Sequence, residues 1–275
     1  TMKFRYNLTG TRLDTRENVT EGGVFVEGLF RLGAGFGMEP GLRLQSFSHS
    51  NRIAVEPRLR LQWRPGGDGG RQLFSAAWGL YHQQVIGLYN QRDVTDAFVV
   101  WAPSPPNRPV AKTMHVIAGW QRKVGPSFDV SVEGFYKTLS HLFFPRFGSA
   151  FGDPSRIEQV TGAARGLEFR LEASRAWFYG YLGYGLNAVH YERPVLSTDE
   201  VPVAVGVERF NPPHDRRHTL NAMAQVALGP YRLGARWQYG SGLPFTQVRG
   251  YYDIVPVTGP DDDDYHTRRG TPRIS

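Results

Sequence analysis

Apolar and polar residues alternate with a period of two along most of this chain. The alternation is clearest in four segments, at residues 58–64, 128–137, 167–172 and 231–239. Successive side chains of a β-strand point to opposite sides, so each segment has one apolar face and one polar face. A helical period of 3.6 residues is not found in any long segment. The pattern therefore predicts an all-β protein.

The alternation predicts about eleven strands, several of them longer than the usual 5–6 residues. Their expected positions are 2–14, 22–32, 36–48, 52–64, 72–85, 110–124, 127–144, 157–174, 176–192, 216–229 and 231–247. A twelfth strand is expected to begin at Gly270. Boundaries from such patterns are good to a few residues.

The connections between these strands alternate in length. Short turns rich in Gly, Pro and Ser lie at 66–70, 125–127, 174–175 and 229–230. Long connections rich in strand-breaking residues lie at 86–109, 145–156, 193–215 and 248–269. This arrangement predicts an antiparallel meander, with the short turns at one end of the strands and most long loops at the other.

Two environments fit a meander with one apolar face. In a soluble barrel or sandwich the apolar face lies inside, whereas in an outer-membrane barrel it meets lipid and the polar face lines the lumen. Aromatic residues gather near the two ends of the apolar faces, as in interfacial girdles. They are Trp63, Phe74, Phe128, Phe178 and Tyr231 near short turns, and Tyr136, Trp237 and Tyr239 toward the far ends. The pattern favours an up-and-down transmembrane β-barrel.

Composition narrows the function classes. The 275 residues include no cysteine, which excludes disulfides, a Cys-ligated zinc site and a thiol nucleophile. The net charge of +7 is spread along the chain and not clustered, so we do not expect nucleic acid as a partner. The longest apolar runs, such as 97–102, are far shorter than the roughly 20 residues of a spanning helix. Nothing in the sequence indicates a cofactor.

Several motifs resemble one known family. The run NPPHDRRHTLN at 211–221, followed by WQYGSGLPFT at 237–246, resembles a block in the late barrel strands of TonB-dependent outer-membrane receptors. Further similar runs are PGLRL at 40–44, EPRL at 56–59, YHQ at 81–83 and GAARGLE at 162–168. The resemblance covers roughly residues 20–250, and the order and spacing of the motifs make it specific.

The resemblance implies a function in energised uptake. Such receptors have a barrel of about 22 strands, plugged by an N-terminal domain, and import scarce ligands such as siderophores, glycans or peptides across the outer membrane. Force reaches the plug from the TonB complex. This chain shows neither a plug nor a TonB-contact segment, and it ends without a terminal aromatic strand. Residues 1–275 are therefore expected to be a partial barrel domain.

The same resemblance implies the partners and the location. The cell outer membrane is the expected location, and its lipid and lipopolysaccharide are expected partners. The TonB complex would act through a plug domain that this chain lacks. The resemblance also implies that a surface lipoprotein or other receptor subunits could be partners.

Two other classes of protein remain open. One is a smaller outer-membrane barrel of about 12–14 strands, either a passive porin or a membrane-embedded hydrolase, in which the first and last strands pair. Ser48 with His49, or Asp215 with His218, could contribute to a triad, but no G-x-S-x-G nucleophile elbow occurs, so an enzyme is not favoured. The other class is a soluble all-β binding module.

The long loops at the barrel mouth are the expected place of ligand binding, because loops on a rigid scaffold commonly carry recognition. The candidate ligand-binding residues are Tyr81, His82, Gln83, Tyr89, Asn90, Arg92 and Trp101. The same mixture of aromatic and polar residues would also be found in a loop that binds no ligand and packs on itself.

Other charged groups have structural interpretations that we favour. Glu168, Arg170 and Glu172 are expected to form ion pairs on the polar face, although they could also line a transport path. Asp215 with Arg216 is expected to hold the 193–215 loop to the next strand. The histidines show no metal-ligand spacing, and the acidic run at 261–264 is expected to be a solvated loop, so no metal site is predicted.

Overall fold

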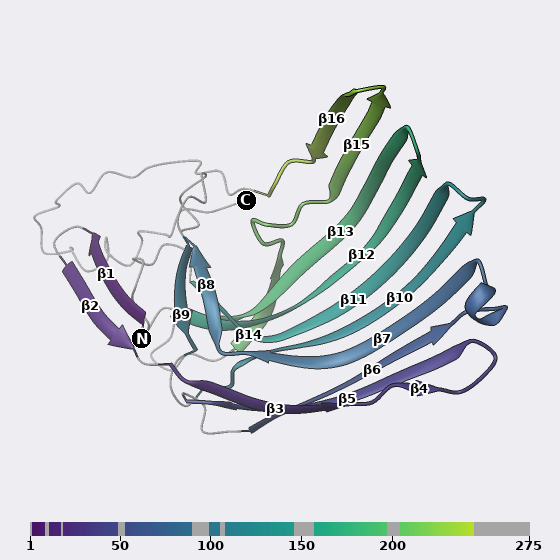
Figure 1. The fold of residues 1–275 in the computed structure, drawn as a ribbon. Helices are drawn as coiled ribbons and strands as arrows, with labels where there is room; N and C mark the ends of the chain where they lie inside the picture. Colours follow the sequence, from purple (N-terminus) through teal and green to yellow (C-terminus); the bar gives the residue numbers. More distant parts are fainter. Residues whose placement is uncertain are drawn as a thin grey trace, which may run out of the picture.

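A single large antiparallel sheet dominates the computed structural model of the chain (Figure 1). The structure describes residues 2–8, 11–17, 19–48, 53–89, 99–104, 108–145, 157–196 and 204–244. Within these ranges the one helical element is a 3-10 turn, η1 (Gly67–Gly69), and no helix is long and apolar enough to cross a membrane. The predicted all-β class is confirmed.

The sheet has twelve strands, and its order follows the chain order, as expected for an up-and-down meander. Its main path runs through β3 (Glu21–Glu27), β5 (Phe36–Phe47), β6 (Ile53–Trp63), β7 (Gln72–Gln83), β10 (Ala111–Val124), β11 (Phe128–Pro145), β12 (Ile157–Arg175), β13 (Phe178–Leu196), β15 (His218–Leu228) and β16 (Tyr231–Gly240). Two short strands extend it, because β4 (Phe30–Arg31) pairs with β5 and β14 (Ala204–Phe210) pairs with β13.

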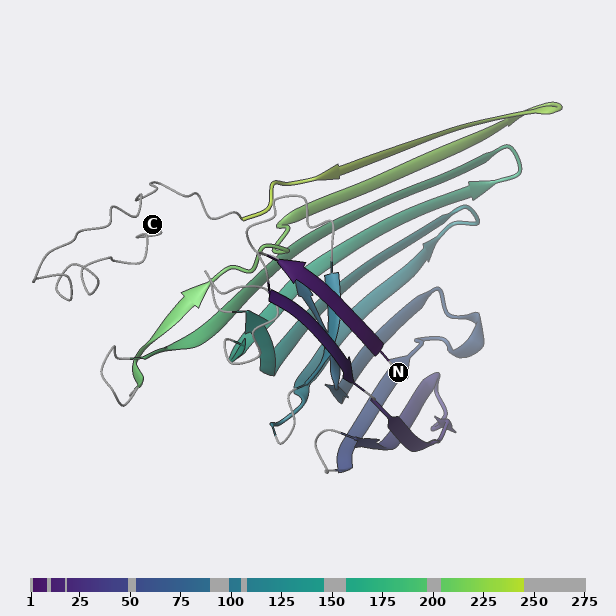
Figure 2. The same ribbon diagram turned by 90° about the vertical axis from the view of Figure 1, so that its left-hand side faces the viewer.

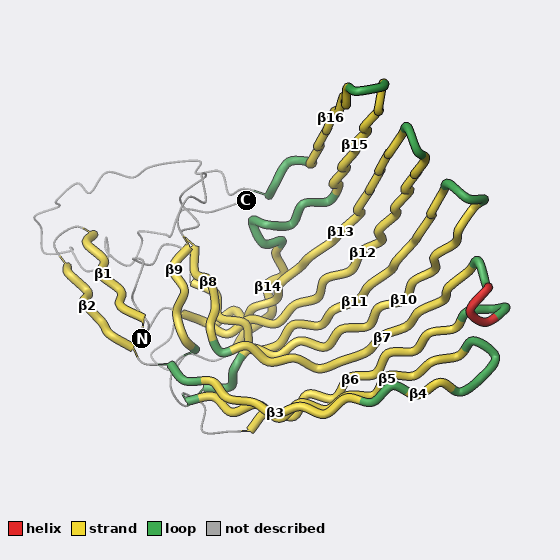
Figure 3. The backbone as a smooth tube through the Cα atoms, viewed as in Figure 1, coloured by secondary structure: helices red, strands yellow, loops and turns green. Residues whose placement is uncertain are grey.

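The sheet is curved but not closed. Strands β3 and β16 lie at its two opposite edges and do not pair with each other (Figure 3). The described strands therefore do not form the small closed barrel in which the first and last strands would meet.

Two hairpins lie outside this sheet. One is formed by β1 (Met2–Leu8) and β2 (Thr11–Glu17), and the other by β8 (Val85–Tyr89) and β9 (Val99–Pro103). The short turns between the long strands all lie at one end of the sheet, as predicted (Figure 2). Gly125 and Gly229 in these turns have φ of 64° and 61°, a conformation that favours glycine.

The three central strands are the longest. Strands β11, β12 and β13 have 18, 19 and 19 residues, so they extend past their neighbours at the end opposite the short turns. A β-bulge interrupts the β11–β12 pairing between Leu139 and Leu142. His141 in this bulge has a φ of 56°, which non-glycine residues rarely adopt.

The two faces of the sheet differ in chemistry across all its strands. One cross-strand row of paired residues is apolar and runs Val132, Phe169, Tyr184, Leu220, Tyr239. The adjacent row on the opposite face begins with Glu133 and Glu168. The polar face is the less exposed one, as expected for the concave side of a curved sheet. We call it the inner face and the apolar one the outer face.

An apolar cluster lies on the inner face at the far end of the long strands. Phe144 of β11, Val160 of β12 and Tyr191 of β13 are buried, and Phe210 of β14 packs on them. The rings of Tyr191 and Phe210 meet edge to face, with centroids 5.9 Å apart. The cluster joins the short strand β14 to the main sheet.

Several predicted boundaries are wrong for identifiable reasons. The strand expected at 2–14 is the β1–β2 hairpin, and the strand expected at 22–32 is interrupted between β3 and β4. The expected loops at 86–109 and 193–215 contain β8, β9 and β14, which lack strong alternation. The strand expected at 231–247 ends at Gly240. The expected strand at Gly270 and the loop at 248–269 lie outside the described residues.

Candidate functional site at the inner wall of the sheet

The candidate ligand residues at the end of β7 are held by contacts with neighbouring strands. The Tyr81 ring packs on the His115 ring of β10, with centroids 4.8 Å apart. The His82 backbone amide donates to Glu56 Oε1 over 2.6 Å, and His82 Nδ1 lies 3.2 Å from the same oxygen. Gln83 Nε2 donates to the Val85 carbonyl over 2.6 Å. These contacts order the start of the β8–β9 hairpin.

Glu56 is the centre of this group. Its residue is 5% exposed, and its second carboxylate oxygen lies 4.0 Å from Arg43 Nε on β5. A buried carboxylate requires such partners, because desolvation without them is costly. The EPRL motif of the sequence thus places a structural anchor at the mouth, beside Tyr81 and His82.

The β8–β9 hairpin rises from this anchor. At its base, the backbone amide and the hydroxyl of Ser104 both donate to the Gln84 carbonyl, over 2.7 and 2.9 Å. Tyr89 is the last residue of β8, and Trp101 of β9 pairs with Gly87. Asn90 and Arg92 lie outside the described residues. The structure therefore brings Tyr81, His82 and Gln83 together, and joins them to the hairpin that carries Tyr89 and Trp101.

A row of potentially cationic side chains on the inner face was not found from the sequence. Arg58 of β6 pairs with Gly79 of β7, Gly79 pairs with His115 of β10, and His115 pairs with Lys137 of β11. Paired residues point to the same face of a sheet. The three residues are more than twenty positions apart in the chain, so only the register of the strands reveals the row.

An acidic row lies nearer the short turns. Glu133 of β11 pairs directly with Glu168 of β12, and Asp129 pairs with Glu172. Neither Glu133 nor Glu168 forms an ion pair within the described part of the chain. Like charges directly opposite each other destabilise a sheet, so this pair favours the approach of a cation.

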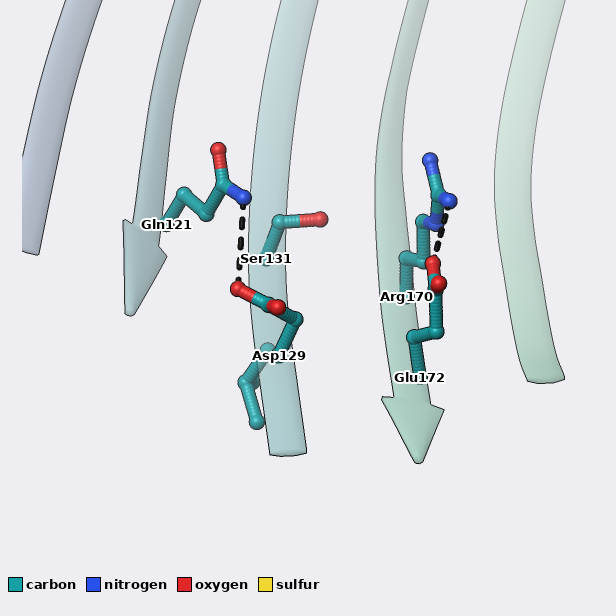
Figure 4. A pocket seen from close by; sticks show the side chains of 6 residues that line it. Gln121, Asp129, Ser131, Arg170 and Glu172 are labelled. Atoms are coloured by element: carbon teal, nitrogen blue, oxygen red, sulfur yellow. Dashed lines mark hydrogen bonds and ion pairs between the residues drawn. The ribbon is translucent and has the colours of Figure 1, made fainter. Parts of the chain in front are cut away.

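A shallow polar pocket of about 150 Å³ lies next to the acidic row, on β10, β11 and β12 (Figure 4). Arg170 Nη2 donates to Glu172 Oε2 over 2.6 Å, and Gln121 Nε2 donates to Asp129 Oδ1 over 3.4 Å. The Arg170–Glu172 contact is the expected structural ion pair. Its charges are neutralised locally, whereas Glu133, Glu168 and Asp129 have no ion-pair partner among the described residues.

The NPPHDRRHTLN motif forms a corner that closes the β14–β15 connection. Asp215 is 1% exposed, and its Oδ1 accepts from the Val189 amide over 2.9 Å. Its Oδ2 lies 3.0 Å from Arg217 Nε. The expectation that Asp215 holds this loop to the sheet is therefore correct, but the arginine beside its carboxylate is Arg217 and not Arg216.

The second half of the motif block docks on the first. The His218 backbone amide donates to Ser241 Oγ over 3.1 Å, and the Ser241 amide donates to the His218 carbonyl over 2.9 Å. The His218 ring contacts the Tyr184 hydroxyl at 2.8 Å and not Asp215. These residues thus have structural contacts, and the Asp215–His218 pair of a hydrolase triad is not assembled. His49 lies outside the described residues.

The remaining histidines do not gather with acids. Among the described residues, no group of three or more His, Cys, Asp or Glu side chains is arranged to hold a metal ion. His190 lies on β13 and His218 lies on β15, so they are on different strands. His214 Nε2 lies 3.3 Å from the Tyr191 hydroxyl, which is not a metal ligand in this group. The acidic run 261–264 lies outside the described residues.

An open antiparallel meander with an apolar outer face and a polar inner wall has the architecture of part of an outer-membrane type of β-barrel. Two solved structures with this fold are the F3-3 variant of the FrpB iron transporter from Neisseria meningitidis and the apoprotein form of its F5-1 variant. Their TM-scores are 0.54 and 0.53, both with 12% sequence identity. Each match covers 80% of this chain and 32% of the transporter, so the chain spans about a third of its length.

The expected resemblance to part of a TonB-dependent receptor barrel is confirmed at the level of the fold. No protein-family model matches the chain, and no curated protein matches its sequence. Both of these solved structures are of an iron transporter. Similarity at this identity concerns the fold alone.

Proposed function

We propose that this chain forms part of the barrel wall of an outer-membrane receptor that imports a scarce ligand with energy from the TonB complex. The observation that carries the proposal is the twelve-stranded open sheet, whose faces are apolar outside and polar inside and which matches part of an iron transporter barrel. The family motifs of the sequence support the same function.

The sheet edges support a larger barrel. Every described residue of β3 and β16 is exposed. In lipid, unpaired backbone groups at such edges cost several kcal/mol each, so only a closed barrel is stable there. Further strands would complete the wall, giving the barrel of about 22 strands that the motifs imply.

The acidic row supports a domain inside the barrel. Glu133 and Glu168 face each other on the inner wall without an ion-pair partner among the described residues. A basic side chain from a plug domain would neutralise these two carboxylates. Such a contact would stabilise a plug that lies beside this part of the inner wall. Partners would then be the plug, the TonB complex acting through it, and lipid and lipopolysaccharide on the outer face.

The mouth residues are the proposed ligand contacts. Tyr81, His82 and Gln83 lie at the base of the β8–β9 hairpin, and Tyr89, Asn90, Arg92 and Trp101 belong to the same connection. Such a hairpin at the loop end of a barrel is well placed to meet a ligand from outside.

Membrane fractionation of cells that express the protein tests the location. The proposal expects the protein in the outer-membrane fraction, soluble only with detergent, and expects the whole receptor that contains this barrel wall to cross-link to TonB in energised cells. Recovery in the soluble fraction without detergent contradicts it.

Paired variants test the plug contact. In the whole receptor, Glu133→Gln with Glu168→Gln should increase protease access to the plug, while Gln225→Glu, also on the inner face but on β15, should not. Equal protease access in both variants contradicts the role of the acidic row.

A further inference from the structure

The cationic row on the inner face has no counter-charge of its own. Neither Arg58 nor Lys137 forms an ion pair in the described part of the chain. The two other arginines nearby are compensated, because Arg60 lies 3.7 Å from Glu39 and Arg43 lies 4.0 Å from Glu56. Arg58 and Lys137 therefore make this strip electropositive, and His115 lies between them in the row.

Tyr81 adds an aromatic surface to this strip. Its ring packs on His115, and its side chain lies across Gly79, where a Cβ would come within 2.9 Å of the Tyr81 hydroxyl oxygen. The hydroxyl is thus held in the middle of the row, between Arg58 and His115. Lys137 Nζ lies 4.9 Å from the centre of the Phe135 ring. Donors and aromatic rings alternate along the wall.

The acids nearest this strip are either engaged by other groups or displaced along the strand. Glu56 is buried and engaged by His82 and Arg43. Glu133 is four residues from Lys137 on the same strand, which places it about 13 Å away. His115 pairs directly with Lys137, so its ring nitrogens lie beside the Lys137 ammonium as further hydrogen-bonding groups for an anion.

We propose that this row, formed by Arg58, Tyr81, His115 and Lys137, binds a small organic anion on its way through the barrel. Three strand spacings separate Arg58 from Lys137, about 14 Å. The long Arg58 and Lys137 side chains can converge from the two ends of this span on an anion with several carboxylate or similar groups. The inference rests on the proposed function, since it names the charge class of the imported ligand.

Citrate is a suitable probe, because it carries three carboxylates. Isothermal titration calorimetry would measure its binding to the protein extracted from cell membranes in mild detergent. Lys137→Gln and Arg58→Gln should each weaken citrate binding roughly tenfold, the order expected for one hydrogen bond to a charged group. Rising salt should weaken binding of the wild-type protein as well.

Arg236→Gln is the matched control, because Arg236 is also an inner-face arginine but lies on β16, away from the row. It should leave citrate affinity within about twofold, since its removal changes only the net charge at a distance. An equal loss in all three variants would overturn the site, because it would show a nonspecific effect of net charge. Lys137→Arg keeps the charge and should retain binding.

The wild-type protein alone gives a second test that needs no variant. Citrate should bind and the polycation spermine should not compete with it. Absence of citrate binding at millimolar concentration, or binding of spermine in place of citrate, would overturn the inference. Outer-membrane fractionation of the same protein is independent, so an anion site can fail while the proposed barrel function stands.

Discussion

The carboxylate of Asp215 accepts a hydrogen bond from the backbone amide of Val189, 2.9 Å away on the next strand of the wall. The Asp215 side chain is fully buried, which shields this bond from water, whereas the Arg217 side chain beside it is 46% exposed. The contact connects the corner before β15 to the extended part of β13. It gives a structural reason for the aspartate in the motif.

Asp215→Ala should destabilise the protein by about 1–3 kcal/mol, because it leaves the Val189 amide without its hydrogen-bond acceptor. Urea unfolding in detergent, followed by tryptophan fluorescence, measures this change. Glu192→Ala is the control, since its contact with Arg209 is exposed and 3.8 Å long. Exposed pairs contribute about 0–1 kcal/mol, so a similar loss in both variants contradicts the role of Asp215.

The bulge in β11 stores backbone strain at His141. His141→Gly should leave stability unchanged or raise it by about 1 kcal/mol, because glycine adopts a positive φ without steric cost. His141→Val should lower stability by a similar amount or more, since β-branched residues tolerate this conformation least. The same unfolding measurement compares the two. A more stable valine variant would show that the bulge is not strained.

Gly162 of the GAARGLE motif allows β12 and β13 to approach closely. A Cβ at this position would lie 2.5 Å from the His190 carbonyl oxygen and 2.6 Å from Tyr191 Cδ1. Gly162→Ala should therefore cost about 1–3 kcal/mol, the range for overpacking. Gly206→Ala on β14 is the control, because nothing lies within 4 Å of its Cβ. Stability to urea should fall only in the first variant.

The outer face should be intolerant of charge if lipid covers it. Phe169→Arg should reduce the free energy of insertion into lipid vesicles by about 2–4 kcal/mol, the cost of arginine at the bilayer midplane. Gln225→Arg on the inner face should change it little, because that face is polar and wet. Equal effects at the two positions would show that the outer face does not meet lipid.

Residue patterns alone determined the strand class, the meander and the assignment of faces. Alternation of period two shows which side chains share a face within one strand, and the strands at 36–48, 52–64, 110–124, 127–144 and 157–174 follow it closely. Where alternation is weak, as in β8, β9 and β14, the pattern failed. Motif order also indicated the transporter barrel that the fold resembles.

Only the tertiary structure decided which strands' residues meet. Arg58, His115 and Lys137 form one row because the registers of three strand pairs bring them together, as they do for Glu133 and Glu168. A one-residue slip would move each of these side chains to the other face. Register depends on contacts between strands that are distant in the chain. The sequence pattern therefore shows which residues are charged, but it does not show which of them lie side by side.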